Sequence, residues 1–440
     1  MNFQESVEYL LSLGNEVTAI KLGLANIQKL LNALGDPHTK YLKVQVAGTN
    51  GKGSVCAFLN SICLKAGINT GMYTSPHLVS ITERVRINGT DISEEDFARL
   101  ATQIRETSER LFDTGEIEYI PTFFEQVTAL ALAAFAEAGV ELAILETGLG
   151  GRLDATTAAN AEIAVITRID IDHQQYLGET IEEIAAEKAA IIHENSMACV
   201  GRQQPQVSGV IKKRCDDLGI VPVTLEKAKW ARHAQGYDFL IDRVQVIGVE
   251  IPLPGDHQVE NAALAILVAD QLNSFFRISE KHIAEGIEST RHPGRLELVK
   301  LSQVEVLLDG AHNSGGAEAL AAYLKVDDPE AISVALLFAA MDDKNVSTML
   351  SSLVPHATDL VVTQLANTRS MSAEKIAMIT KDQFGFDRIS VVPDVRHALK
   401  VAIETASAYR ATRWRLVVVT GSLYLVGEVK RLLQEPEFEI

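Results

Sequence analysis

Apolar and polar positions alternate along this chain so that buried strands are predicted between amphipathic helices. Short apolar runs bounded by turn residues predict strands, and apolar positions three and four residues apart predict helices. In the first part of the chain the predicted strands are residues 41–47, 141–146 and 163–167. The predicted helices there are residues 54–66, 123–138 and 180–192. Strands that alternate with helices in this way are typical of parallel α/β sheets.

The pattern changes twice further along the chain. Residues 230–254 contain short extended segments, and a helical pattern follows at residues 259–272. The segment RHPGRLE, residues 291–297, combines proline and glycine with charge, as linkers do. Beyond it the alternation restarts, with predicted strands at residues 304–308, 332–338, 359–362, 389–392 and 415–420. We therefore expect two α/β domains, residues 1–296 and the smaller 297–440.

The composition narrows the class of protein. The formal net charge is −18, from 40 basic and 58 acidic side chains, so the chain lacks the basic surface that nucleic-acid binding needs. The first residues carry acids where a signal peptide has a basic region, and no apolar run reaches the ~20 residues of a membrane-spanning helix. The four cysteines form no CxxC pair. We expect a cytoplasmic protein with no nucleic-acid or membrane partner.

A glycine-rich loop, VAGTNGKGSV at residues 46–55, joins the first predicted strand to the first predicted helix. Its glycines let the backbone present N–H groups to phosphate oxygens at a helix N-terminus, and Lys52 adds a positive charge. The loop departs from the pattern GxxxxGK[ST], because Val46 replaces the first glycine and Gly53 follows the lysine. It is therefore either a phosphate-binding loop or a glycine-rich turn with a lysine in solvent.

Two further predicted strands end in groups that can bind a metal ion. Glu146 ends one strand and would lie at the carboxyl edge of a parallel sheet, where a Mg²⁺ that bridges nucleotide phosphates needs a carboxylate. Asp170, Asp172 and His173 follow the next strand and reach the same edge. The alternatives are a solvated strand end for Glu146 and an ordinary loop histidine for His173.

Lys188 lies on the apolar stripe of the helix predicted at residues 180–192. Ile184 and Ile191 share that stripe at helical spacing, whereas Glu187 lies off it, so Lys188 points inward. A buried ammonium group is costly unless it is paired, and burial favours the neutral amine, which can react. The alternatives are a modified or catalytic lysine and a lysine whose stem covers apolar surface while its amine reaches water.

Polar turns also follow three strands of the second predicted domain. DGAHN places Asp309 and His312 after one strand, and LFAAMDDKN and VVVTGSLYL have the same form. Each turn is a weak signal, because every α/β domain has such turns. Together they predict that the second domain presents polar groups at one edge of its sheet.

Taken in order, these motifs resemble the folylpolyglutamate synthase and dihydrofolate synthase family of Mur-type ATP-dependent amide ligases. The motifs are GTNGKGS, TSPHL, ETGLGGRLDAT, DHxxYLG, EKAAII, HPGRLE and DGAHN, from about residue 20 to the end. GTNGK is shared with the peptidoglycan Mur ligases, whereas TSPHL, GLGGRLDAT and HPGR point to the folate branch. The resemblance implies an α/β protein, with a P-loop-type parallel-sheet ATPase domain followed by a smaller Rossmann-like domain.

The resemblance implies that ATP phosphorylates a substrate carboxylate and that the amine of L-glutamate attacks the acyl phosphate. The implied ATP-binding residues are Thr49, Asn50, Gly51, Lys52, Gly53, Ser54, Asn261, Arg295 and Asp309. The implied ligands of two Mg²⁺ ions are Ser75, Glu146, His173 and Lys188, the last as a carbamate formed with CO₂. Lys188, Lys52 and His312 would act at the reacting groups.

The resemblance also places a pterin-bearing substrate against three segments. These are Leu22, Gly23 and Leu24; Thr122, Phe123, Phe124 and Glu125; and Leu153, Asp154 and Ala155. Phe124 would stack on the flat ring. NTRSMS, residues 367–372, resembles the family's arginine-containing loop only loosely, so the glutamate contacts stay unassigned. Ala190 stands where the family usually has glycine.

Several functions stay open. The ligase would act on dihydropteroate and reduced folates, or as a folylpolyglutamate synthase only. A peptidoglycan Mur-type ligase needs an additional N-terminal domain, and only 47 residues precede GTNGK, which is below the ~50 of a small domain. A nucleotide-binding regulator without turnover would lack Lys52, Glu146, His173 or Lys188, all of which are present. We expect a monomer whose partners are small molecules.

Overall fold

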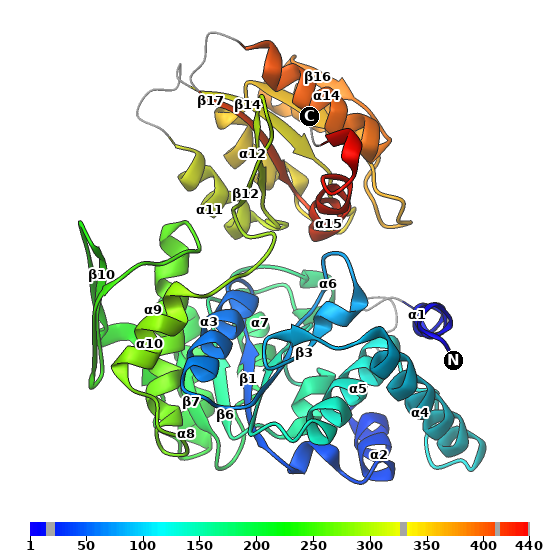
Figure 1. The fold of residues 1–440 in the computed structure, drawn as a ribbon, viewed down its shortest axis with the longest axis vertical. Coiled ribbons are helices and arrows are strands. Elements are labelled where there is room, and N and C mark those ends of the chain that lie inside the picture. Colours follow the sequence, from blue (N-terminus) through cyan, green and yellow to red (C-terminus); the bar gives the residue numbers. More distant parts are fainter. Residues whose placement is uncertain (15–22, 326–331, 410–413, 439–440) are drawn as a thin grey trace. The chain divides into compact units, whose positions relative to one another are not determined.

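Residues 1–14, 23–325, 332–409 and 414–438 are described by the computed structural model (Figure 1). The chain divides into two units, the first made of Met1–Pro252 and Gln258–Arg291 and the second of Leu253–His257 and His292–Ile440. HPGRL thus belongs to the second unit, although the sequence boundary was expected after it. Two hydrogen bonds tie this segment to the loop after residue 308 of the second unit. Leu296 N donates to Asp309 Oδ2, and Gly310 N donates to Gly294 O.

The first unit is built on an eight-stranded sheet with the order β4-β3-β2-β5-β1-β6-β7-β8. Its strands are β1 Leu42–Ala47, β2 Thr70–Tyr73, β3 Val85–Ile87, β4 Thr90–Asp91, β5 Leu142–Glu146, β6 Ile163–Ile166, β7 Met197–Val200 and β8 Val223–Thr224. Six strands of this sheet are parallel to one another: β2, β5, β1, β6, β7 and β8. Strands β3 and β4 add an antiparallel edge beside β2. The central strands are buried along their length, as parallel strands covered on both faces must be.

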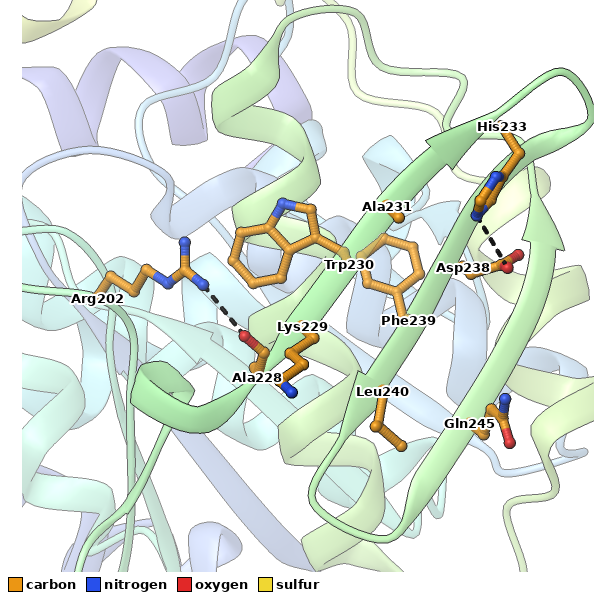
Figure 2. A pocket seen from close by; sticks show the side chains of 10 residues that line it. All are labelled: Arg202, Ala228, Lys229, Trp230, Ala231, His233, Asp238, Phe239, Leu240 and Gln245. Carbon is orange, nitrogen blue, oxygen red and sulfur yellow. Dashed lines mark hydrogen bonds and ion pairs between the residues drawn. The ribbon is translucent and has the colours of Figure 1, made fainter.

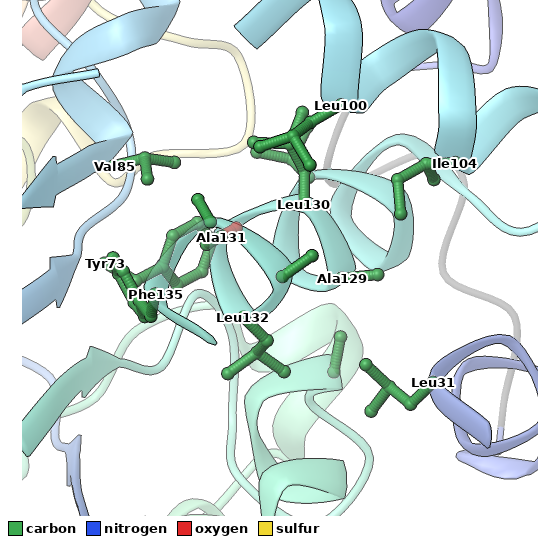
Figure 3. Close-up of a cluster of buried hydrophobic side chains, with 14 of the residues drawn as sticks. Leu31, Tyr73, Val85, Leu100, Ile104, Ala129, Leu130, Ala131, Leu132 and Phe135 are labelled. Atoms are coloured by element: carbon green, nitrogen blue, oxygen red, sulfur yellow. The ribbon is translucent and has the colours of Figure 1, made fainter. Parts of the chain in front are cut away.

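Helices of the first unit connect and cover these strands. They are α1 Phe3–Ser12, α2 Ala25–Ala33, α3 Lys52–Lys65, α4 Glu94–Asp113, α5 Phe123–Glu137, α6 Gln174–Leu177, α7 Ile181–Ala189, α8 Pro205–Asp217, α9 Asp256–Leu272 and α10 Glu280–Glu288. Figure 3 shows α5 among side chains of the sheet and of α2 and α4, where Leu130, Leu132 and Phe135 are buried. This packing fixes the start of α5 beside the ends of β2 and β5.

A separate three-stranded antiparallel sheet, in the order β11-β10-β9, completes the first unit. Its strands are β9 Lys229–His233, β10 Gly236–Ile241 and β11 Val244–Val249. Helix α10 packs on both β11 and α3. Gly286 makes that contact possible, because a Cβ there would lie 2.4 Å from the Cα of Ile62.

The second unit has a six-stranded sheet with the order β12-β13-β17-β14-β15-β16. The strands are β12 Glu297–Lys300, β13 Glu305–Leu308, β14 Ile332–Phe338, β15 Asp359–Val362, β16 Ile389–Val391 and β17 Trp414–Thr420. Only β12 runs antiparallel to its neighbour in this sheet. The helices are α11 Ser314–Leu324, α12 Val346–Leu353, α13 Ala373–Phe384, α14 Val395–Ala408 and α15 Leu423–Leu432. The expected α/β class is confirmed for both units.

Most predicted elements exist within a few residues of their expected bounds. Helix 180–192 is the main exception, because α7 ends at Ala189. The extended segments expected at residues 230–254 are the separate antiparallel sheet. Strands β2, β3, β4, β7, β8 and β12 were not predicted. Within the described ranges, no helix combines the length and apolar character of a membrane span.

Candidate active site

Three parallel strands bring their following loops to one edge of the eight-stranded sheet. Strand β1 pairs with β5 and β6 on its two sides, and Val46 lies opposite both Glu146 and Val165. The carboxyl ends of the three strands are therefore level, which is where open α/β sheets bind ligands. The glycine loop follows β1, Glu146 ends β5, and the loop with His173 follows β6.

The glycine loop passes so close to its neighbours that side chains would not fit at two positions. A Cβ at Gly48 would lie 1.9 Å from Thr167 Oγ1, and one at Gly51 would lie 2.4 Å from Asn261 Oδ1. Gly51 is the N-cap of α3 with φ 90°, and no side chain caps this helix. The first-turn N–H groups of a helix have no acceptor within the helix, so this N-terminus suits an anion.

The main-chain N–H groups of Thr49 and Asn50 both donate to Arg168 O, at 2.9 and 3.1 Å. Their side chains are also engaged, because Thr49 Oγ1 donates to Asp170 O at 2.8 Å and Asn50 Nδ2 donates to Asp170 Oδ2 at 3.0 Å. These two residues therefore tie the loop to the segment after β6. The N–H groups placed for phosphate are those from Lys52 to Ser54, at the start of α3.

Two lysine side chains converge on one carbonyl group of the glycine loop. Lys52 Nζ donates to Gly48 O at 3.1 Å and to Thr49 O at 3.2 Å. Lys188 Nζ donates to the same Gly48 O at 2.9 Å, and this lysine is 5% exposed. The predicted inward orientation of Lys188 is confirmed. The side-chain nitrogens of Lys52 and Lys188 therefore meet at one carbonyl oxygen of the glycine loop.

The predicted metal ligands lie on three loops of this edge. Ser75 follows β2, and its N–H donates to Glu146 Oε2 at 3.3 Å. Glu146 is 7% exposed. His173 has φ 52°, its N–H donates to Asp172 Oδ1 at 2.8 Å, and its Nε2 lies 3.8 Å from Asp172 Oδ2. Asp172 thus orients the imidazole.

The donor set at this edge is chemically suited to Mg²⁺ or Mn²⁺, which accept carboxylate, hydroxyl and imidazole groups. Among the residues that the structure describes, no three His, Cys, Asp or Glu side chains gather into a metal site. The predicted set includes only Glu146 and His173 of these residue types. The other two predicted ligands, Ser75 and Lys188, lie outside the residue types of such a cluster.

The start of α5 forms the next wall of this edge. Thr122 caps the helix, and Thr122 and Glu125 exchange hydrogen bonds in a capping box. The Phe124 ring lies 5.9 Å from the Tyr73 ring, and it fills the space beside Gly148, where a Cβ would be 2.6 Å from the ring. Phe123 is buried beneath the guanidinium of Arg84, at 5.2 Å, so it belongs to the core.

Asp154 organises its own loop. Its Oδ2 accepts the N–H groups of Gly148 and Leu149, and its Oδ1 accepts the N–H and hydroxyl of Thr156. Burial nevertheless raises the pKa of this carboxyl, against the lowering effect of these bonds. Ala155 is buried with it, and Leu153 is half-buried.

Of the other segment expected to contact the substrate, Leu22 lies outside the described residues. Gly23 has φ 137° and Leu24 is the N-cap of α2.

In the second unit, Asp309 joins the HPGR segment to the loop after β13. Its oxygens accept the N–H groups of Leu296 and Ala311. Burial raises the pKa of Asp309, and the Arg295 charge acts in the opposite direction. His312 Nδ1 lies 2.8 Å from Gly310 O, so Nδ1 carries the proton in this bond. Predicted residues of the second unit are thus assembled around one buried carboxyl group.

Two polar turns of the second unit that remained unassigned lie together. Arg369 of NTRSMS pairs with Asp343 of MDDKN at 2.8 Å, and Asp342 N donates to Arg369 O. Lys375 pairs with Asp342 at 2.9 Å. The sequence placed Asp170 at the edge of the first sheet, but nothing in the local pattern shows that it accepts a hydrogen bond from Asn50.

Comparison with known proteins agrees with this geometry. The family model "Mur ligase middle domain" matches residues 46–269, and "Dihydrofolate synthetase, C-terminal domain" matches residues 294–432. A probable dihydrofolate synthetase of Schizosaccharomyces pombe is 34% identical over 94% of this chain and 99% of its own. The dihydrofolate synthase/folylpolyglutamate synthase of Bacillus subtilis is 33% identical over 94% of this chain and 96% of its own.

Solved structures give the same result for the fold. The folylpolyglutamate synthase of Mycobacterium tuberculosis, complexed with ADP and AMPPCP, superposes with a TM-score of 0.89 at 32% identity, over 99% of both chains. An Escherichia coli protein in complex with DHPP and ADP superposes with a TM-score of 0.84 at 30% identity, over 98% of both chains. This chain therefore belongs to the dihydrofolate synthase/folylpolyglutamate synthase family of the Mur ligases.

Proposed function

We propose that this protein is an ATP-dependent ligase that adds L-glutamate to dihydropteroate, to the glutamate tail of reduced folates, or to both. The observation that carries the proposal is the convergence of Lys52 and Lys188 on Gly48 O, at a helix N-terminus beside Glu146. The named relatives support the reaction class. So do solved structures of relatives with DHPP and ADP, and with Mn, AMPPNP and L-glutamate.

The first unit would hold the ATP phosphates. The N–H groups at the start of α3 point out of the helix end, and Lys52 adds its charge to them. Asn261 packs against Gly51 and would limit how the nucleotide enters. A bound Mg²⁺ would neutralise charge on the phosphate and carboxylate oxygens. Ser75, Glu146 and His173 would be its ligands, together with a modified Lys188.

The burial of Lys188 supports the proposed carbamate. Its amine is buried and shares the acceptor Gly48 O with Lys52, and burial in general disfavours the charged form of an amine. The neutral Nζ would attack the carbon of CO₂, forming an N–C bond, and the displaced proton would pass to solvent. The side chain then ends in an anionic pair of oxygens, which is the kind of ligand that Mg²⁺ prefers.

The pterin-bearing substrate would lie against Phe124. Tyr73 and Gly148 hold this ring from two sides, so its position is fixed before a ligand arrives. A preorganised ring loses little side-chain entropy when it stacks on another flat ring. Thr122 and Glu125 would keep the start of α5 rigid through the capping box rather than by touching the substrate.

For the second unit we propose that Arg295 and Asp309 bind the nucleotide and that His312 lies near the reacting end. The Nδ1–H of His312 is held by Gly310 O, which fixes the tautomer and orientation of its imidazole. The first unit would then be the ATP- and folate-binding domain and the second the Mur-ligase-like C-terminal domain. We further propose a cytoplasmic monomer, for which four buried, unbridged cysteines are consistent with a reducing compartment.

The test is ADP formation by the purified protein with ATP, Mg²⁺ and L-glutamate. Activity is expected only when dihydropteroate or tetrahydrofolate is also present, and comparing the two acceptors decides between the dual activity and polyglutamate extension alone. Mass spectrometry should show a product heavier by one glutamyl group. ADP formation that a UDP-muramyl substrate drives equally well, or that no pterin compound stimulates, would overturn the assignment.

A further inference from the structure

The glycine loop depends on a second segment for its position. Segment 167–170, which follows β6, accepts main-chain and side-chain hydrogen bonds from Thr49 and Asn50. The Oγ1 of Thr167 in turn donates to Asn50 O at 2.8 Å. Whatever fixes segment 167–170 therefore also fixes the glycine loop.

Gln203 holds the same segment through two other main-chain groups. Its Nε2 donates to Thr167 O at 2.8 Å, and its Oε1 accepts the N–H of Ile169 at 3.1 Å. Thr167 and Ile169 are buried, and buried main-chain groups need such partners. One residue of a parallel neighbouring strand would bond the same pair, the C=O before and the N–H after the residue opposite it. The Gln203 amide therefore acts as an added strand residue opposite Arg168.

A side chain takes this place because the main chain leaves the sheet here. Gly201 N donates to Ile166 O at 2.8 Å, which continues the β6–β7 pairing one residue beyond the end of β7. The chain then turns into α8, whose first residue is Pro205. Proline has no N–H to donate to a neighbouring strand. The amide of Gln203 thus continues a pairing that the main chain has left.

Arg202, the residue before Gln203, anchors this turn on the small antiparallel sheet. Its guanidinium lies 3.9 Å from the centroid of the Trp230 ring, and its Nη2 donates to Ala228 O at 3.2 Å (Figure 2). Its Nη1 lies 3.7 Å from Glu260 Oε1. A guanidinium held by a ring, a carbonyl group and a carboxylate restricts the main chain beside it. The backbone that carries the Gln203 side chain is therefore fixed.

We propose that Gln203 is a positioning residue of the ATP site. It holds segment 167–170, and this segment holds Thr49 and Asn50 in the loop that leads into α3. The inference rests on the proposed function, because it takes the start of α3 as the place where the ATP phosphates bind. Gln203 raises the affinity for ATP through these bonds and takes no part in the chemical step.

Calorimetric binding of AMPPNP in the presence of Mg²⁺ tests this role without turnover. Gln203→Leu keeps a side chain of similar size but makes neither bond, so we expect about tenfold weaker binding of AMPPNP. The KM for ATP should rise by a similar factor, whereas kcat and the KM for L-glutamate should change little. A defect in folding alone would lower kcat and leave KM unchanged, because fewer molecules would be active.

Hydrogen–deuterium exchange and matched variants locate the change. The peptide that contains Thr49 and Asn50 should exchange faster in Gln203→Leu than in wild type, since the bonds of these residues are weakened. Gln204→Leu is the matched control, because Gln204 is the exposed neighbour and its side chain does not cap α8. It should change neither the exchange nor the binding of AMPPNP. Gln203→Glu keeps the acceptor but has no donor for Thr167 O at neutral pH, so it should also weaken binding.

The outcomes separate this inference from the ligase assignment. Wild-type affinity for AMPPNP in both Gln203 variants, or equal losses in Gln203→Leu and Gln204→Leu, would overturn the inference alone. A lower kcat at an unchanged KM for ATP would assign Gln203 to folding only and would also overturn it. Wild-type protein that does not bind AMPPNP would overturn the proposed ATP site and this inference together.

Discussion

The protein uses the same local form, a strand followed by a polar turn and a helix, in two different ways. After β1 the turn leads into α3, whose N-cap Gly51 has no side chain to cap the helix. After β13 the turn leads into α11, where the side chain of Asn313 accepts the N–H of Gly316 and caps the helix. The first helix end is thus left for an external anion, whereas the second is satisfied by the chain itself.

The two turns also differ in what they gather. In the first turn, Gly48 O accepts hydrogen bonds from the side-chain nitrogens of Lys52 and Lys188. Asp309 instead collects main-chain N–H groups around a buried carboxyl, whose pKa burial raises. The same fold motif therefore gathers lysine side chains in the first unit and main-chain N–H groups in the second. The difference is visible only in the contacts, because both turns are polar and follow a buried strand.

The largest expected effect is on turnover, when Lys188 beside the glycine loop is replaced. Lys188→Ala should lower turnover by about 10²–10³-fold, the size of loss found when one preorganised electrostatic contact to a reacting group is removed. Lys188→Arg keeps a long basic side chain but cannot form a carbamate, so it should lose as much. The thermal midpoint of both variants shows whether the fold survives. A Lys188→Arg variant with wild-type activity would contradict the carbamate.

The next effect concerns the shape of that turn. Gly48→Ala places a methyl group 1.9 Å from Thr167 Oγ1, so the loop must shift, at a cost of about 1–3 kcal/mol. ATP affinity measured by calorimetry should fall about tenfold or more. Gly316→Ala, in the corresponding helix of the second unit, meets nothing closer than 3.2 Å and is the matched control. An equal loss of ATP affinity in Gly48→Ala and Gly316→Ala would contradict the claim that the first turn, and not the start of α11, binds the ATP phosphates.

A smaller effect is expected at Asp170, which holds Asn50 from the loop after β6. Asp170→Ala should raise KM for ATP about three- to tenfold, since one hydrogen bond of about 1 kcal/mol is lost, with kcat little changed. Asp170→Asn can still accept from Asn50 and should restore KM. If KM stays at the wild-type value in the alanine variant, Asp170 does not position the glycine loop.

The smallest effect concerns pH and the second turn. The pKa of Asp309 is raised in the folded protein, so this group favours folding at low pH and loses that contribution as pH rises through its folded pKa. Asp96 is a control of opposite sign, because hydrogen bonds from Ser93 and Arg99 lower its pKa. The free energy of unfolding is measured with denaturant at several pH values for wild type, Asp309→Asn and Asp96→Asn. The slopes of this free energy against pH should differ from wild type in opposite directions for the two variants. Parallel slopes would contradict the buried-carboxyl account.

The sequence predicted much of this arrangement, because it depends on local periodicity. The apolar stripe of α7 already placed Lys188 inward, and the short apolar run before Glu146 placed that residue at a strand end. Strand β2 was missed, since it is four residues long and contains Gly71, which makes room for Phe135. Such a short run carries no clear period.

The bonds around Asp170 could not be predicted for a different reason. They require that β6 pair with β1 in a register that brings Arg168 and Asp170 opposite Thr49 and Asn50. That register is a property of the assembled sheet, and residues 120 positions apart show no sign of it in their local pattern. The same limit applies to the N–H groups of Thr49 and Asn50, whose bonds to Arg168 O no local pattern indicates.

The central claim is that ATP activates a substrate carboxylate at the glycine loop of the first unit. Its most direct test uses dihydropteroate, or tetrahydrofolate if that is the accepted substrate, with ¹⁸O in the reacting carboxylate. If the carboxylate is phosphorylated and glutamate then displaces phosphate, each inorganic phosphate released carries one ¹⁸O atom. Mass spectrometry of the phosphate reads this out. Unlabelled phosphate alongside the glutamyl product would contradict the account.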